Sequence, residues 1–285
     1  MFSDSEKAVL KRLLDDPSDA VRTSLQAHFM EREEDALAFL RELMNDRRSG
    51  LAWYARQYLD RIGVDDTVQV FREFIRSFSY ELETGSWLLD RTVFPRMDAT
   101  VPGAVLDAMA GRVMELMIEP SSDIDKCRLI NRVMFHEYGF RGDLEEFRNP
   151  ESSFLSRVVE RRKGIPISLS IVYILVATRC GIDLRPVGIP GRFMVGCFSE
   201  DRPVFIDVFE GGRFLSVADV LIFLETNRIP YDEGSLSPIP VGELLCRSCR
   251  NLNNQYRMAN DLVKASLFEE FVMEFQDAYR REHQS

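Results

Sequence analysis

Residues able to act as nucleophile, base or metal ligand are few in this chain of 285 residues, which has five cysteines and three histidines. The histidines are His28, His136 and His283, and only His136 lies near the predicted core in sequence. A serine nucleophile needs a base within hydrogen-bond reach, so Ser168 with His136 is the candidate catalytic couple. The alternative, which we favour, is that His136 packs at a helix end and bonds to the backbone or to Glu137.

The cysteines offer one recognisable spacing. Cys246 and Cys249 form a C-x-x-C pair, which is typical of redox and zinc sites. A structural zinc site needs four ligands, and no second C-x-x-C or H-x-x-x-H is present. The strand–helix context of a thioredoxin-type site is also missing. We therefore predict two thiols on a helix, no metal and no cofactor. Cys197 alternates with apolar neighbours and is predicted to be buried on a strand.

The elements that would position these residues change character along the chain. The run "ISLSIVYILVATRC" is apolar on nearly all sides, which predicts a buried helix that ends at Gly181. It is too short to span a bilayer. The runs "LRPVGI", "RFMVGCF" and "PVFIDVF" follow, and "EGGRFL" indicates a turn into a last strand. Gly, Pro and polar residues separate them, which predicts antiparallel strands joined by tight connections.

Helical patterns flank this segment. Residues 1–65 are expected to form short amphipathic helices that resemble HEAT repeats, too few for an independent solenoid. Residues 66–216 are predicted to hold the core and its helical front, in which Ser152 or Ser153 could cap a helix. Residues 217–285 are predicted to be helical, ending in a hairpin that resembles a tetratricopeptide repeat. The expected fold class is α+β and mostly helical.

One long stretch carries a family resemblance. The sequence "NPESSFLSRVVERRKGIPISLSIVYILVATRCGIDLRPVGIPGRFMVG", followed by "FIDVFEGG", resembles the SirB-type branch of the transglutaminase-like superfamily, most strongly over residues 130–216. The resemblance implies a transglutaminase- or papain-like core, in which a central helix packs on a small antiparallel sheet. It also implies a bacterial cytoplasmic protein with a helical front and a tetratricopeptide-like tail.

The same resemblance identifies degenerate triad positions. In catalytic members of the superfamily a cysteine begins the central helix, and a histidine and an aspartate follow on the next strands. These positions correspond to Pro166, Arg192 and Asp207 in this sequence. Proline offers no nucleophile, and a guanidinium stays protonated and cannot act as a base. We therefore predict no catalytic residue there, and an ion pair between Arg192 and Asp207 or an anion that both hold.

Charge and composition exclude other classes of protein. The formal net charge of −10 argues against a nucleic-acid binder, which needs a basic face to neutralise phosphates. No window has eighteen uninterrupted apolar residues, so no membrane span is expected, and the N-terminus lacks the apolar core of a signal peptide. Five irregularly spaced cysteines favour reduced thiols in the cytoplasm.

The predicted function is a non-catalytic scaffold or binding protein of the bacterial cytoplasm. Its partner is expected to be a protein or peptide, and the sequence does not predict an oligomeric state. The competing hypothesis is a hydrolase or acyl transferase that uses another nucleophile in the pocket around Arg192 and Asp207. Ser168 and His136 would line that pocket if the competing hypothesis holds.

Overall fold

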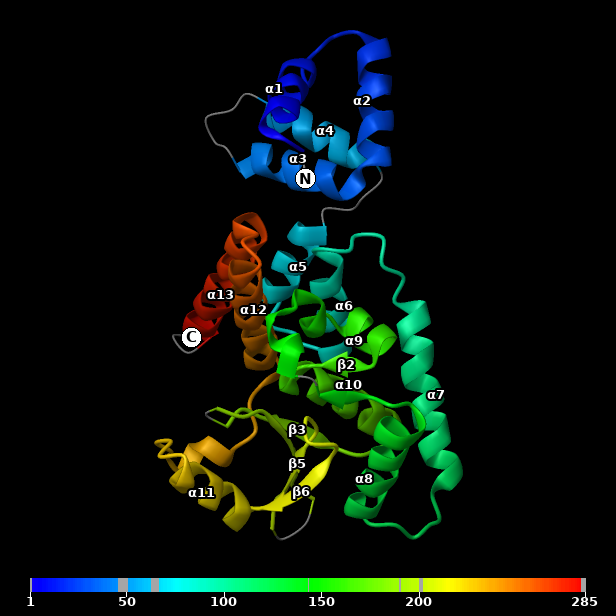
Figure 1. Cartoon of the computed structure of the whole chain (residues 1–285), viewed down its shortest axis with the longest axis vertical. Coiled ribbons are helices and arrows are strands. Elements are labelled where there is room, and N and C mark those ends of the chain that lie inside the picture. The colour runs from blue at the N-terminus through cyan, green and yellow to red at the C-terminus, as the bar shows by residue number, and fades with distance from the viewer. Residues whose placement is uncertain are drawn as a thin grey trace. The chain divides into compact units, whose positions relative to one another are not determined.

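The chain forms two compact units, residues 1–70 and residues 71–285 (Figure 1). The structure is a computed structural model, and it describes residues 2–45, 51–62, 67–142, 144–189, 191–199 and 202–282. The predicted boundary between residues 65 and 66 lies outside the described residues. The predicted domain 217–285 lies wholly within the second unit. The predicted domain 66–216 also lies there, apart from its residues 66–70.

The first unit is helical, as expected, and its helices are α1 (Asp4–Leu13), α2 (Asp19–Glu31), α3 (Glu33–Asn45) and α4 (Ala52–Ile62). A capping box starts α1, because the Ser3 hydroxyl accepts from the Glu6 N–H while the Glu6 carboxylate accepts from the Ser3 N–H at 2.7 Å. The apolar faces enclose a core that includes Phe29, Phe39 and Tyr58. The HEAT-type assignment stays a prediction.

The second unit surrounds one buried helix. Its helices are α5 (Thr67–Arg76), α6 (Leu82–Arg91), α7 (Thr100–Leu116), α8 (Asp123–Asn131), α9 (Leu155–Arg161), α10 (Pro166–Arg179), α11 (Val217–Thr226), α12 (Val241–Met258) and α13 (Leu262–Glu282). Every residue of α10 from Ile167 to Ala177 is buried, which confirms the predicted core helix. Proline suits the first position of α10, because an N–H there would have no helical partner. Gly181, at φ +71°, ends the segment.

The predicted antiparallel sheet is confirmed. Strands β3 (Leu184–Val187), β4 (Met194–Cys197), β5 (Val204–Asp207) and β6 (Arg213–Ser216) pair in sequence order, each antiparallel to the next. Helix α10 contacts β3 and β4, and α11 contacts β6. Val220 and Leu224 of α11 pack with Met194 and Phe205 of the sheet. Helices α10 and α11 therefore each cover the apolar side chains on one face of the sheet.

A two-stranded ribbon leads into α10. Strands β1 (Arg141–Gly142) and β2 (Lys163–Gly164) are parallel, and β2 lies directly before the helix. Gly142 contacts the ring and the carbonyl oxygen of Phe209 so closely that a Cβ atom would have no room. The ribbon thereby holds the turn that follows β5 against the segment that precedes α10.

The predicted cap of α9 is wrong. Ser152 and Ser153 lie in the preceding 3-10 turn, and neither side chain caps the helix. The first two N–H groups of α9, from Leu155 and Ser156, instead donate to the carboxylate of Asp90 on α6 at 3.0 and 2.6 Å. Local sequence signals could not indicate this cap, because the acceptor lies about 65 residues away.

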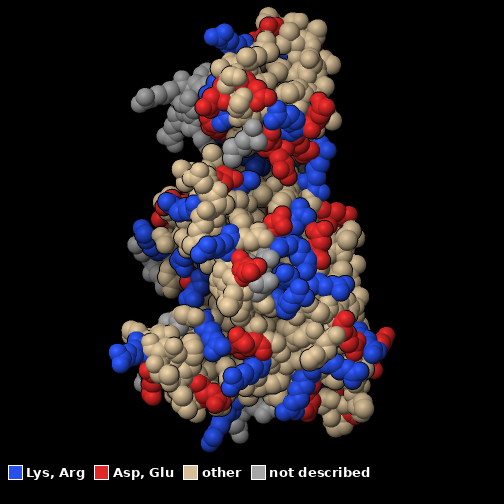
Figure 2. Space-filling view, in the orientation of Figure 1, with Lys and Arg blue, Asp and Glu red and all other residues tan. Residues whose placement is uncertain are grey.

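The tail helices belong to the second unit through both charge and aromatic contacts. Charged residues of both signs are interspersed over the face shown in Figure 2. The Arg72 guanidinium of α5 contacts Glu270 and Glu274 of α13, each at 2.5 Å. Beside this contact, the rings of Phe71 and Phe271 meet edge to face with their centres 4.9 Å apart. Helix α13 is therefore fixed to α5 within one compact unit.

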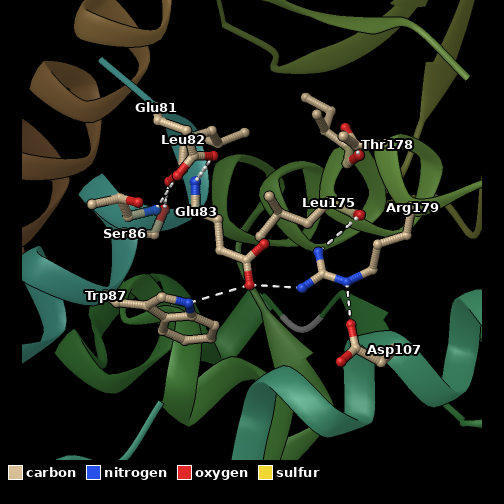
Figure 3. Close-up of polar contacts among 11 residues, drawn as sticks. Glu81, Leu82, Glu83, Ser86, Trp87, Asp107, Leu175, Thr178 and Arg179 are labelled. Carbon is tan, nitrogen blue, oxygen red and sulfur yellow. Dashed lines mark hydrogen bonds and ion pairs between the residues drawn. The ribbon is translucent and has the colours of Figure 1, made fainter. Parts of the chain in front are cut away.

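One guanidinium fixes the last turn of α10 (Figure 3). Arg179 Nη2 lies 2.7 Å from the Glu83 carboxylate of α6, and its Nε lies 2.6 Å from the Asp107 carboxylate of α7. Its Nη1 also donates to the carbonyl oxygen of Leu175 at 3.2 Å. The same Glu83 carboxylate accepts from the indole N–H of Trp87 at 3.3 Å. Three helices thus meet at one side chain.

A second polar junction holds the β5–β6 turn. The Tyr173 hydroxyl of α10 donates to Asn131 Oδ1 at 2.9 Å, and Asn131 Nδ2 donates to the carbonyl oxygen of Gly212 at 2.7 Å. Gly212 has φ +79°, and a Cβ atom on it would clash with the Asn131 carboxamide. The turn after Asp207 therefore requires glycine at this position.

The substitution Gly212→Ala should destabilise the second unit by about 2–4 kcal/mol, from left-handed strain and overpacking together. Gly139→Ala is the matched control, because Gly139 has φ +72° but open space around its Cβ position. We expect the control to cost about 1 kcal/mol. Urea unfolding followed by Trp87 fluorescence measures both, in a Trp53→Phe background that leaves one of the two tryptophans. Equal losses would show that the contact with Asn131 adds no constraint.

Candidate functional site

The predicted ion pair between Arg192 and Asp207 is present. Asp207 ends β5 with its side chain 1% exposed, and Arg192 lies in the β3–β4 connection with 25% of its side chain exposed. Arg192 Nη2 is 2.7 Å from Asp207 Oδ2. The guanidinium carbon also lies 4.6 Å from the centre of the Phe223 ring on α11, a cation–π contact.

The ion pair offsets only part of the free-energy cost of burying the charged Asp207 carboxylate. Asp207 Oδ1 accepts from the Glu210 N–H at 3.2 Å. Asp207 Oδ2 has the Arg192 nitrogen beside it, but no described N–H points at it in hydrogen-bond geometry. Burial raises the pKa of Asp207 above its usual range, and the charge of Arg192 opposes this rise without cancelling it. The pair is thus a close charge contact rather than a bidentate hydrogen bond.

Pro166, which the sequence comparison assigned to the cysteine position, has no nucleophilic group. Pro166 is half-buried at the start of α10. Two residues further on, the Ser168 hydroxyl is 1% exposed, donates to the Ser152 carbonyl oxygen at 2.6 Å and accepts from the Ile165 N–H at 3.1 Å. The Ser168 hydroxyl, which was the candidate nucleophile from the sequence, is therefore already hydrogen-bonded to two backbone groups.

The structure does not bring the candidate couple together. His136 is exposed in a π-helical turn (Arg132–Glu137) that follows α8. No hydrogen bond joins it to Ser168 among the described residues, and it is not among the residues lining the cavity that Ser168 borders. His283, the third histidine named above, lies outside the described residues. A Ser168–His136 couple is therefore absent from this structure.

Sequence reasoning missed one buried acid, Asp90. Its side chain is fully buried on α6, where it accepts the two N–H groups at the start of α9. Burial raises the pKa of Asp90 to about 7, although Ser156, Leu155 and Arg157 act in the opposite direction. The signal in the sequence was an aspartate within the apolar helix pattern "GSWLLDRTVFP", where a charge is costly.

The thiols resemble core side chains. Cys246 and Cys249 are buried on α12, as predicted for two thiols on a helix, and Cys197 is buried on β4. Burial raises the pKa of Cys127 to about 12 and that of Cys246 to about 11. Thiols held protonated at neutral pH are poor nucleophiles. Cys127 and Cys246 are therefore poor candidates for a catalytic nucleophile.

The described part of the chain has neither a metal-binding cluster nor a membrane-spanning helix. No group of three or more His, Cys, Asp or Glu side chains there could hold a metal ion. Within the same residues, no helix is both long enough and apolar enough to cross a bilayer.

A buried helix is followed by an antiparallel sheet, and an ion pair joins the β3–β4 connection to the end of β5, as expected for a transglutaminase-like core. The family model described as "Transglutaminase-like superfamily" matches residues 103–250, just over half of the chain. The chain therefore belongs to the transglutaminase-like superfamily. No solved structure matches it.

Curated relatives come from bacteria and mammals. A "UPF0162 protein" of Xylella fastidiosa (strain 9a5c) is 32% identical over 189 residues, which are 63% of this chain and 66% of the relative. A "UPF0162 protein" of Vibrio cholerae is 24% identical over 132 residues, 46% and 49% of the two chains. "F-box only protein 21" of Mus musculus is 32% identical over 98 residues, 32% of this chain and 16% of that protein. The match thus spans just under two thirds of the Xylella relative.

The substitution Arg192→Ala should destabilise the second unit by about 2–3 kcal/mol at pH 8, because it leaves Asp207 buried without a counter-charge. The loss should shrink as the pH falls, since the pKa of Asp207 is already raised and a protonated carboxyl needs no counter-charge. Urea unfolding at several pH values measures this. Arg185→Ala, which removes an exposed pair with Asp183, is the control and should change little. A loss that persists in the Asp207→Asn background would contradict the pairing.

Proposed function

We propose that this protein is a non-catalytic transglutaminase-like scaffold of the bacterial cytoplasm, which binds a protein or peptide partner. The SirB-type branch is the part of the superfamily to which we assign it. The core supplies a shaped surface around Pro166, Arg192 and Asp207 instead of a reaction centre. Fold alone does not imply function, so the proposal depends on what these positions can do chemically.

The Arg192–Asp207 ion pair is the observation that carries the proposal. A general base must lose and regain a proton near neutral pH, and a guanidinium does neither. Arg192 is also held by the Phe223 ring on its other side. Restoring a base would require replacing this residue, and the aspartate that would orient the base already neutralises a fixed cation. A protein that only binds a partner needs no general base.

The flanking helices are proposed as additional partner surfaces. The end of α12 and the start of α13 expose Met258, Leu262 and Val263, which are 67%, 63% and 50% exposed. Exposed apolar side chains that lie together are typical of interaction sites. This supports a tetratricopeptide-like use of the tail, and the HEAT-like first unit is assigned the same kind of role. The relatives' printed names state no reaction.

Site-specific photocrosslinking tests the proposal in the full chain. A benzoylphenylalanine at position 192 or 166 should yield protein adducts in bacterial cells, while the same residue at position 185 should not. Position 185 is the control because Arg185 is exposed on β3 of the same sheet. In parallel, electrophilic probes for serine and cysteine nucleophiles should leave the core unlabelled. Labelling of a core serine or cysteine at neutral pH would favour a hydrolase or acyl transferase instead.

The variant Arg192→His alone should gain no hydrolytic activity towards ester or amide substrates, because position 166 still lacks a nucleophile. Adding Pro166→Cys to it should produce a thiol at the N-terminus of α10, where the helix dipole lowers the thiol pKa. We expect that thiol to react with iodoacetamide faster than any native cysteine, measured by mass spectrometry. Hydrolysis by the single Arg192→His variant would contradict the proposal.

A further inference from the structure

Two large apolar side chains are exposed in the 3-10 turn η2 (Leu144–Arg148), which follows β1. Leu144 is 77% exposed and Phe147 is 44% exposed. Residues three apart lie on the same side of a 3-10 helix, so the two side chains form one apolar surface. The Phe147 ring also meets the ring of Phe209, with the centres 5.6 Å apart. Exposed apolar side chains that lie together are typical of interaction sites.

Buried groups hold this turn in place. Gln255 of α12 is 3% exposed and donates from Nε2 to the Phe147 carbonyl oxygen at 3.3 Å. Its Oε1 accepts from the Ser153 hydroxyl at 2.7 Å. On the other side, Gly142 of β1 lies so close to Phe209 that a Cβ atom would have no room. A surface that is already held in place loses little conformational entropy when a partner binds.

Three exposed arginines lie on segments that contact this turn or belong to it. Arg141 lies on β1, Arg148 ends η2, and Arg162 lies between α9 and β2. The Arg141 N–H donates to the Arg162 carbonyl oxygen at 3.0 Å, and β2 contacts η2. The backbone thus brings these three arginines and the exposed apolar side chains into one region of the second unit.

Among the described residues, no carboxylate forms an ion pair with these three arginines. The ion pairs nearby join other residues, namely Arg132 with Glu137, Arg157 with Glu160, and Arg161 with Glu151. Glu145 of η2 has a contact of its own, and Asp143 lies outside the described residues. The guanidinium carbon of Arg162 lies 5.9 Å from the centre of the Tyr138 ring, a contact that leaves its charge unbalanced.

We propose that Leu144, Phe147 and the arginines 141, 148 and 162 form a docking surface for an acidic peptide segment of a partner protein. The segment would carry apolar side chains among its carboxylates. Guanidinium groups match carboxylates in geometry as well as in charge, so the arginines would pair with the acidic side chains. The exposed leucine and phenylalanine would supply the apolar contact. The inference rests on the binding role proposed above and names the chemistry of the partner.

The charge of the whole molecule favours a short acidic segment over a polyanion. The formal net charge is −10, so a long nucleic acid or an anionic membrane is repelled by the protein as a whole. A short peptide responds mainly to the cations that it touches, because salt screens charges further away. The observations therefore favour a protein partner at this surface.

A fluorescein-labelled random copolymer of glutamate and tyrosine tests the proposal with the full chain. Its fluorescence anisotropy should rise on binding, with a dissociation constant at least about fivefold lower than that of polyglutamate, because tyrosine adds apolar contact. Single-stranded DNA and vesicles of phosphatidylserine with phosphatidylcholine should bind more weakly. The proposal would be overturned if the copolymer does not bind, if polyglutamate binds equally well, or if DNA or vesicles bind more tightly.

Variants show whether the copolymer binds at this surface. Replacing the three arginines together (Arg141→Ala, Arg148→Ala, Arg162→Ala) should raise its dissociation constant at least about fivefold. The matched control removes three other exposed arginines and the same charge, with the substitutions Arg202→Ala, Arg213→Ala and Arg228→Ala. It should change binding less than about twofold. Equal losses in both triple variants would show that binding follows net charge alone, against the proposal.

The contribution of the apolar surface is tested separately by Leu144→Ser. This side chain is exposed, so the substitution should leave the Tm unchanged while it weakens copolymer binding about threefold. Unchanged affinity would remove the apolar contact from the proposal and overturn it as stated.

Crosslinking in bacterial cells separates this inference from the proposed function. A benzoylphenylalanine at position 144 should yield protein adducts that disappear in the triple variant Arg141→Ala, Arg148→Ala, Arg162→Ala. Adducts at positions 166 and 192 but none at position 144 would overturn this docking surface alone. Adducts at position 144 together with a labelled core nucleophile would overturn the non-catalytic role alone.

Discussion

The complete burial of α10 is the constraint on which the second unit depends. A helix that is apolar on all sides must be covered on all sides, and no single neighbouring element can do this. Helices α6, α7 and α9, the sheet and α12 each take one part of its surface. Front, sheet and tail are therefore joined in one compact unit, although the sequence reads as three successive segments.

The same burial decides the chemistry at the start of α10. A proline satisfies the helix start without a donor, and the Ser168 hydroxyl is bound to backbone groups that close the first turn. Arg192 of the β3–β4 connection and Asp207 at the end of β5 are likewise engaged with each other, in a charge contact. The Ser168 hydroxyl and the Arg192–Asp207 pair are thus both used to hold structure.

Features encoded by local periodicity were predictable from the sequence. The buried helix, its stop at Gly181 and the order of the four strands follow from apolar runs and turn residues. The Arg192–Asp207 pair was also predicted, because the resemblance to the family suggested that these two residues lie close together. The carboxylate of Asp90 was missed, and with it the true cap of α9, because that contact joins residues far apart in sequence. The docking of α13 on α5 is equally nonlocal, so no window of sequence could reveal it.

The contact between Arg72 and Glu274 has a consequence for how the chain is made. The two residues are 202 positions apart in sequence. Helix α5 is therefore synthesised long before its partner α13. Until α13 is made, the apolar surface of α5 lacks part of its cover, and α6 and α10 similarly lack cover until α12 is made. Exposed apolar surfaces of this kind aggregate readily. The second unit can close only after α13 has left the ribosome. A chain whose contacts are this far apart in sequence folds more slowly, and keeps apolar surface exposed for longer, than one built from local contacts.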